Sequence, residues 1–349
     1  MSRRQTTSSR HIHPGNRRDG TIAALPHTPC SVAAWQPGDA AAFPKGERVT
    51  SLAEWRKTGS FFEHKGHRIF WHEAGNPTAP ALLLIHGFPT ASWDWERLWP
   101  DLAGRYHLLT LDMIGFGFSD KPRSYDYRIM DQADVHEELL RIQAVREFDV
   151  LAHDYGLSVA AELLARDSES AARPKLLSVA LLNGGLFPEM HRRIFIQSLL
   201  LSPLGPLVSR LTSKERLSKN MRALFGKYYP PDQETLDGMW TLIKTNHGER
   251  IMHKLIHYIP DRIEHRERWV GAVQKTNVPV KLIDGLLDPV SGAHMVAHYR
   301  KLIPNANVTE LPEAGHYPQV QMPREVLQAY LEFRGQAGKH VQAGLQSFT

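Results

Sequence analysis

The sequence contains very little cysteine, since Cys30 is the only one among 349 residues. A chain with one thiol cannot form an intrachain disulfide, so nothing in it indicates an oxidising compartment. No group of His, Asp or Glu residues shows metal-ligand spacing. We therefore expect a cytoplasmic protein that holds no metal and needs no organic cofactor.

A long hydrophobic run is also missing. The most apolar segment, residues 194–211, is interrupted by Pro203, Gly205 and Pro206. It falls short of the roughly 20 apolar residues that a transmembrane helix needs. The sequence therefore indicates no stable membrane insertion, and we predict that this segment is a buried or pocket-lining helical one.

Outside the N-terminal region, the sequence has almost no excess of positive over negative residues. The net charge is +5, but residues 1–50 carry seven Lys or Arg against three Asp or Glu, so the remainder is nearly neutral. Nucleic-acid binding needs a face of one sign, and we expect no nucleic-acid partner. The glycine-containing segment 115–120 lacks the lysine and spacing of a phosphate-binding P-loop, which predicts a structural turn.

The two ends of the chain differ from the rest. Residues 1–48 are rich in Arg, Ser, Thr, Pro and Gly without an apolar period, which predicts a disordered basic tail. An Arg-rich segment with few acids also resembles an organellar transit peptide, so that interpretation stays open. Residues 339–349 are predicted to be a C-terminal tail.

Short apolar runs alternate with helical stretches between the two ends. Runs such as ALLLIHG, HLLTLDMIG, FDVLAHD, LLSVALLNG and VPVKLIDG have the pattern of strands covered on both faces. Their alternation with helices predicts an α/β fold with a mainly parallel, doubly wound sheet, formed by residues 49–183 and 272–338. The helix-rich interval 184–271 predicts an inserted cap over the carboxyl edge of the sheet, where ligands bind.

The stretch LAHDYGLSVA, residues 151–160, has the spacing of a nucleophile elbow. Ala152 and Gly156 stand two positions before and after Asp154, and such a strained turn between strand and helix needs small neighbours. The frame often presents a serine, but here it would present a carboxylate. The alternative is that Asp154 merely caps the following helix.

Three further positions complete an arrangement for nucleophilic catalysis. The segment HGFP, residues 86–89, follows a strand and would aim the Phe88 N–H into the site, where it would form an oxyanion hole with the N–H of Tyr155. Asp288 follows the next-to-last core strand and His316 follows the last, in the order nucleophile, acid, histidine. Asp284 is an alternative to Asp288 as the acid.

The segments HGFP, DMIGFGFSDKP, HDYG, GLLDPV and AGHYP, in this order, resemble the α/β-hydrolase superfamily in its epoxide hydrolase and haloalkane dehalogenase branch. A closer resemblance, carried by NGGLFPEMHR, FGKYY and RERWVGA, is to the mesoderm-specific transcript protein family. The resemblance implies an eight-stranded, mostly parallel sheet with an inserted helical cap. It also implies an aspartate nucleophile, and a monomer or homodimer that takes a small apolar substrate and water.

An aspartate nucleophile suits substitution at a saturated carbon. A carboxylate attacking a carbonyl would give an anhydride, whereas attack on an alkyl carbon gives an alkyl ester on Asp154. His316, oriented by Asp288, would then activate the water that hydrolyses this ester. The sequence thus predicts a hydrolase that acts through an aspartyl ester.

The leaving group separates two chemistries. The resemblance implies side-chain N–H donors for a departing halide next to the nucleophile and after the HG pair, but Tyr155 and Phe88 stand there. It also implies two cap tyrosines that protonate an opened epoxide, and Tyr258 with Tyr228 are the candidates. An epoxide hydrolase-like activity is therefore expected first, with haloalkane dehalogenation as the alternative.

Other side chains are expected around the substrate. Trp93 and Phe187 are predicted to line an apolar pocket, and Asn183 is predicted to orient water or product. A third interpretation is a binding protein without activity that has kept a hydrolase frame. The complete set of nucleophile, acid and histidine argues against it.

Overall fold

The computed structural model describes residues 50–170 and 172–346. The tail predicted over residues 1–48 lies outside them. Within the described residues, no helix combines the length and the apolar character that crossing a bilayer requires.

Eight strands form one sheet in the order β1-β2-β4-β3-β5-β6-β7-β8. The first two pairings, β1 with β2 and β2 with β4, are antiparallel, and the others are parallel. The strands span Ser60–His64 (β1), His67–Ala74 (β2), Ala81–Ile85 (β3), His107–Leu111 (β4), Glu147–His153 (β5), Lys175–Leu182 (β6), Val280–Gly285 (β7) and Asn307–Leu311 (β8). The predicted eight-stranded, mostly parallel sheet is confirmed.

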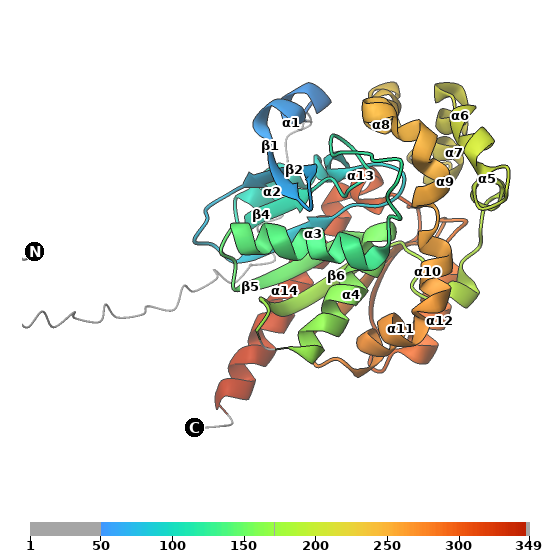
Figure 1. The fold of residues 1–349 in the computed structure, drawn as a ribbon. Helices are drawn as coiled ribbons and strands as arrows, with labels where there is room; N and C mark the ends of the chain where they lie inside the picture. The colour runs from blue at the N-terminus through green and yellow to red at the C-terminus, as the bar shows by residue number, and fades with distance from the viewer. Residues whose placement is uncertain (1–49, 171, 347–349) are drawn as a thin grey trace, which may run out of the picture. The chain divides into compact units, whose positions relative to one another are not determined.

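Alternate residues of the central strands point to opposite faces of the sheet, and each face has its own core. Leu83 and Ile85 of β3 belong to the cluster with α3, α4 and α12, whereas Leu82 and Leu84 belong to the cluster with α1, α2 and α14. Figure 1 shows α3 and α4 in front of the sheet and α14 behind it. The helices outside the cap are Leu52–Thr58 (α1), Trp99–Ala103 (α2), Ile129–Ile142 (α3), Tyr155–Glu169 (α4), Ala293–Leu302 (α12), Pro318–Gln321 (α13) and Pro323–Gln346 (α14), with a 3-10 turn at Ser92–Trp95 (η1).

Both ends of the described chain are more helical than the sequence pattern indicates. The helix α1 precedes the first strand and buries Trp55 fully. At the other end, α14 runs on to Gln346, so the prediction of a tail over residues 339–349 is corrected to a helix through Gln346. The helix continues because no Pro interrupts the sequence after Pro323.

The described elements of the interval 184–271, for which the sequence predicts a cap, are all helices, and the last of them runs on to Lys275. They are Pro188–Met190 (η2), Phe195–Leu200 (α5), Gly205–Arg210 (α6), Lys214–Phe225 (α7), Gln233–Lys244 (α8), Thr245–Ile251 (η3), Met252–Leu255 (α9), Tyr258–Glu264 (α10) and Arg266–Lys275 (α11).

The apolar segment 194–211 differs from its prediction. It forms two short helices, α5 and α6, separated at Pro203, and the side chain of Phe195 is 82% exposed. Leu204 and Leu207 are also more than half exposed. Each short helix contacts its neighbours on one side only, so apolar residues on its other side are exposed. The predicted burial is therefore wrong for Phe195, Leu204 and Leu207.

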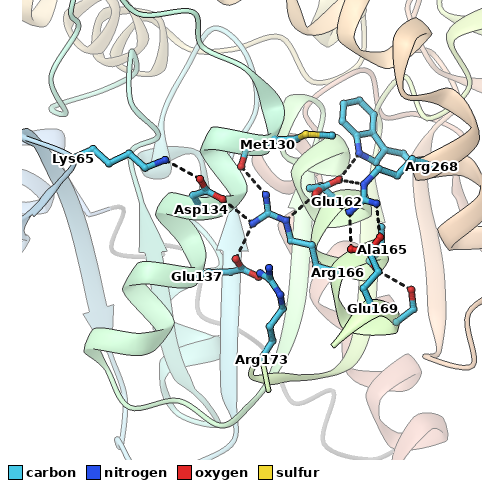
Figure 2. A network of polar contacts seen from close by, with 12 residues as sticks. Lys65, Met130, Asp134, Glu137, Glu162, Ala165, Arg166, Glu169, Arg173 and Arg268 are labelled. Carbon is cyan, nitrogen blue, oxygen red and sulfur yellow. Dashed lines mark hydrogen bonds and ion pairs between the residues drawn. The ribbon is translucent and has the colours of Figure 1, made fainter. Parts of the chain in front are cut away.

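A buried polar network joins the end of the cap to the helix that follows the elbow (Figure 2). The carboxylate of Glu162 on α4 is 2% exposed and accepts hydrogen bonds from Arg166, Arg268 and the indole of Trp269, at 2.7 to 2.8 Å. Arg166 also pairs with Asp134 on α3. The network therefore ties α11 and α3 to α4, whose first turn lies in the candidate site.

Candidate active site

Asp154 lies at the sharp turn between β5 and α4. Its backbone has φ 46° and ψ −104°, a positive φ that is uncommon for a residue with a side chain and that marks strain often found at functional sites. A Cβ at position 156 would lie 2.5 Å from the carbonyl oxygen of Ile85, so only glycine fits there. The spacing that predicted a nucleophile elbow thus corresponds to an elbow in the backbone.

The loop after β3 holds one oxygen of this carboxylate. The backbone N–H of Phe88 donates to Asp154 Oδ2 at 3.0 Å, and the Asp154 side chain is almost fully buried. Gly87 permits this approach, because a Cβ there would lie 2.9 Å from the Cβ of Asp154. The second predicted oxyanion donor is the amide of Tyr155, which begins α4 and therefore has no acceptor within the helix.

Asp288 and His316 lie next to the other oxygen. His316 Nδ1 donates to Asp288 Oδ2 at 2.7 Å, and His316 Nε2 is 3.9 Å from Asp154 Oδ1. Asp288 is fixed by the Ser291 hydroxyl at 2.6 Å and by the side-chain amide of Asn183 at 3.1 Å. The structure thus brings the three predicted residues together, with His316 between two carboxylates.

The two carboxylates determine the charge of His316. Burial alone would lower the pKa of its imidazole, but Asp288 and Asp154 outweigh burial and raise that pKa to about 9. Burial would raise the pKa of Asp288, but the charge and hydrogen bond of His316, with the bond from Ser291, lower it to about 2. At neutral pH the site therefore holds a protonated His316 between Asp154 and an ionised Asp288.

Asp284 was the alternative acid, and its surroundings are different. Its side chain on β7 is fully buried, and neither oxygen has a hydrogen-bond partner among the described residues. Burial, together with the charge of Asp288, raises the pKa of Asp284 well above its usual range. The geometry therefore places Asp288, and not Asp284, at His316.

His153, which precedes Asp154, supports the loop of His316. Its Nε2–H donates to the backbone carbonyl of His316 at 2.7 Å, which fixes the tautomer of a neutral ring. Burial, followed by the charge of His316, lowers the pKa of His153 to about 3. His153 therefore holds the loop of His316 in place and remains uncharged at neutral pH.

The structure brings only one of the two predicted cap tyrosines into the site. Tyr258 is fully buried, its ring packs against those of Phe88 and Tyr155, and its hydroxyl oxygen accepts a hydrogen bond from Gln197 at 3.3 Å. Burial and the Asp154 charge raise the pKa of its phenol, which therefore keeps its proton at neutral pH. Tyr228 is 51% exposed beside Lys227, so its prediction as a partner of Tyr258 is corrected.

The predicted pocket residues have other contacts. The indole of Trp93 lies against Gly238 of α8 and donates to the Thr50 carbonyl, and Phe187 packs on His298 and Tyr299 of α12. Their assignment to the substrate pocket is therefore corrected, because both fill contacts between elements. Asn183 lies in the site, but it binds the acid Asp288 and the backbone of Gly285.

One residue of the site was missed in the sequence. Arg262 of α10 is 2% exposed, donates from Nη2 to the Asp154 carbonyl at 2.7 Å and from Nε to the Ser158 hydroxyl at 2.6 Å, and lies over the ring of Tyr258. In the sequence it stands close to two other arginines, Arg266 and Arg268, and no spacing distinguishes it. Only the packing of the cap on the core shows its place.

Chemically, the arrangement offers a buried carboxylate, a paired imidazole and backbone N–H groups. Over residues 50–170 and 172–346, no three His, Cys, Asp or Glu side chains are grouped so that they could hold a metal ion. The chemistry available from the described side chains is therefore that of nucleophile, base and hydrogen-bond donor.

Comparisons with known proteins identify the fold family. The family model described as alpha/beta hydrolase fold matches residues 80–323. The mesoderm-specific transcript protein of Mus musculus is 39% identical over 302 residues, which cover 83% of this chain and 90% of the mouse protein.

Two solved structures share the fold at low sequence identity. A loop variant of the haloalkane dehalogenase DbeA from Bradyrhizobium elkanii is 20% identical, with a TM-score of 0.67 over 83% of this chain and 99% of its own. The epoxide hydrolase CorEH is 19% identical, with a TM-score of 0.66 over 79% and 98%. Since the family model spans more than half of the sequence, the chain belongs to the α/β-hydrolase fold family.

Proposed function

We propose that this hydrolase opens an apolar epoxide to a diol through an ester formed on Asp154. The observation that carries the proposal is the position of the Asp154 carboxylate at the elbow, with Oδ2 held by the Phe88 N–H and Oδ1 3.9 Å from His316 Nε2. The uncommitted Oδ1 would attack a ring carbon, and the ring C–O bond would break. Tyr258, whose phenol is protonated, would donate the proton that the ring oxygen takes up.

The charge of Asp154 couples the two halves of this reaction. While Asp154 is ionised it supports the proton on His316. Alkylation turns that carboxylate into a neutral ester, so the pKa of His316 falls, and its proton would pass to the Tyr258 phenolate and restore the phenol. The neutral His316, still oriented by Asp288, would then take a proton from the water that attacks the ester carbon, with the Phe88 N–H stabilising the oxyanion.

The described side chains favour an epoxide over a haloalkane. A halide leaving group needs N–H donors, but the indole N–H of Trp93 donates to Thr50 and that of Trp269 to Glu162. The indole N–H of Trp95 has no partner among the described residues, but this residue belongs to the core cluster with α1, α2 and α14, whereas Phe88 and Tyr155 belong to the other cluster. Tyr258, in contrast, supplies a protonated hydroxyl at the site. The protonated Tyr258 therefore supports the epoxide assignment, and haloalkane hydrolysis remains the alternative, since the guanidinium of Arg262 near Asp154 could also serve as a donor.

A trapping experiment tests the proposal. In a His316→Gln variant the ester forms but is not hydrolysed, so incubation with styrene oxide should raise the intact mass by that of the whole epoxide. Incubation with 1-bromobutane would add only a butyl group if the chain were a dehalogenase. A His316→Gln and Asp154→Asn double variant is the control and should stay unmodified. The absence of an adduct with both reagents would overturn the covalent mechanism.

A further inference from the structure

The guanidinium of Arg262 has one nitrogen without a partner. Nη2 and Nε are both used in hydrogen bonds, but Nη1 is buried and has no hydrogen-bond partner among the described residues. Both ring nitrogens of His191 in the adjoining loop are likewise buried without a hydrogen bond of good geometry, although the Gln197 side chain lies close enough to affect the pKa of this imidazole. A buried charged N–H without an acceptor is costly, and such a group in a site calls for a ligand.

These unpartnered atoms lie side by side at the nucleophile. A Cβ added to Gly185 would lie 2.5 Å from Arg262 Nη1 and 2.6 Å from His191 Nδ1, so both atoms border the same glycine. Arg262 Nη2 is 3.9 Å from Asp154 Oδ1, the oxygen assigned to attack. A group bonded to the attacked carbon would therefore come within reach of the guanidinium.

The charges of the site change when the ester forms. Before the reaction, Arg262 and protonated His316 face the carboxylates of Asp154 and Asp288. Alkylation removes the charge of Asp154, and Asp288 remains paired with His316. Arg262 then has no ionised carboxylate within 4 Å among the described residues, because Asp154 was the one in that range.

We propose that Arg262 binds a carboxylate carried by the substrate next to the carbon that Asp154 attacks, so that the substrate class is an epoxy acid with an apolar body. The substrate carboxylate supplies the missing acceptor for Nη1 and takes the place of the Asp154 charge beside the guanidinium. Guanidinium groups suit carboxylates because their N–H groups match the two oxygens. This inference rests on the proposed function, which defines the reacting carbon.

Binding of an unreactive acid tests the proposal independently of turnover. Titration calorimetry of the full-length protein with butyrate and with butyramide compares a carboxylate with a neutral group of the same shape. Butyrate should bind the protein with Arg262 at one site and at least about tenfold more tightly than butyramide, as expected for a charge-assisted hydrogen bond. Equal affinity for the two compounds would overturn the proposal.

Variants show whether Arg262 is the binding group. Arg262→Met should weaken butyrate about tenfold or more and leave butyramide unchanged, while Arg266→Met, whose side chain instead pairs with Glu189 on the surface, should change neither. Because Arg262→Met removes buried contacts, Gly185→Ala is a second variant that keeps the charge but displaces Nη1 or His191, and it should weaken butyrate binding as well. Unchanged butyrate binding in a folded Arg262→Met or Gly185→Ala protein would overturn the proposal.

Failure of this inference and failure of the proposed function are distinguishable. If the trapping experiment gives no ester but butyrate still binds in an Arg262-dependent way, the proposed mechanism is wrong and the carboxylate site is supported. If styrene oxide forms the ester but butyrate binds no more tightly than butyramide, the mechanism is supported and the carboxylate site is wrong.

Discussion

At the scale of single residues, the protonation of His316 follows from the carboxylates on its two sides. The Asp154 and Asp288 charges hold the proton on a buried imidazole that burial alone would make neutral. In the proposed mechanism, the charge of the nucleophile Asp154 thus also determines when His316 can act as the base. This coupling suits a reaction in which the same carboxylate is first consumed and then regenerated.

Replacing Asp154 by Asn should therefore lower the pKa of His316. The neutral amide keeps the shape of the side chain but removes one of the two charges that favour the imidazolium, so the pKa should fall from about 9 towards the ordinary value of histidine. Imidazole nitrogen and proton shifts followed by NMR across a pH titration measure it. Asp237→Asn on the exposed face of α8 is the control, and an unchanged His316 titration in Asp154→Asn would contradict the coupling.

The sequence allowed the prediction of some site residues and not others, for physical reasons. Asp154 was predictable because the elbow is a local turn whose need for small neighbours is visible in Ala152 and Gly156. Arg262 was not, because burial of an arginine depends on how the cap packs on the core. Tyr228 was placed wrongly because a tyrosine in a cap has the same local pattern whether it faces the site or water.

At the scale of elements, the position of α4 depends on a carboxylate far from the chemistry. Glu162 is nearly fully buried and holds two arginines and an indole, which come from α4 itself and from α11. The pKa of Glu162 is lowered, since hydrogen bonds from Arg268 and Arg166 outweigh the raising effect of burial. The network in Figure 2 therefore fixes the last cap helix against the helix that begins at the nucleophile.

Glu162→Gln should destabilise the protein by about 3 kcal/mol. The amide keeps the volume but removes the charge that Arg166 and Arg268 share, and these two keep partners at the edge of the network, among them Asp134 and Glu169. Breaking a buried ion pair on one side typically costs about 3–5 kcal/mol, and the remaining partners place the expected cost at the lower end. Glu169→Gln removes an exposed carboxylate bound to the same Arg268 and should cost less than about 1 kcal/mol. Urea unfolding of both variants measures the difference, and equal costs would show that the buried network contributes nothing special.

The prediction of elements was most accurate for the central strands, whose burial on both faces gives a simple pattern in the sequence. The parallel strands were visible as short apolar runs, since both faces are covered. The segment 194–211 was misjudged because apolar composition indicates burial only when a helix is long enough to present one face to its neighbours. Its prolines and Gly205 leave two short helices with exposed apolar side chains.

At the scale of the whole molecule, buried acids make the stability depend on pH. Asp284 is fully buried without partners, and its folded-state pKa is raised above its unfolded value. A group with a raised folded-state pKa contributes stability that is complete below the unfolded pKa, near 4, and is lost as the pH rises towards the folded-state pKa. The folded protein holds a proton there that the unfolded chain releases.

Asp284→Asn should therefore flatten the decline of stability between pH 5 and pH 8. The variant removes one titrating proton, which accounts for a slope of at most about 1.4 kcal/mol per pH unit. Urea unfolding at several pH values in this range measures the slope, with Glu267→Gln as a control at a 92% exposed side chain. The same slope in wild type and Asp284→Asn would show that Asp284 is ionised in the folded protein.

The central claim, that Asp154 becomes esterified and is then hydrolysed at its carboxyl carbon, has a direct isotopic test. The wild-type protein is allowed several turnovers of styrene oxide or 3-phenylglycidate in water enriched in oxygen-18, and the peptide containing Asp154 is then analysed by mass spectrometry. The account predicts that one oxygen-18 enters the Asp154 carboxylate, because water attacks the ester and not the substrate. A label found in the diol from the first turnover, with none in Asp154, would contradict it.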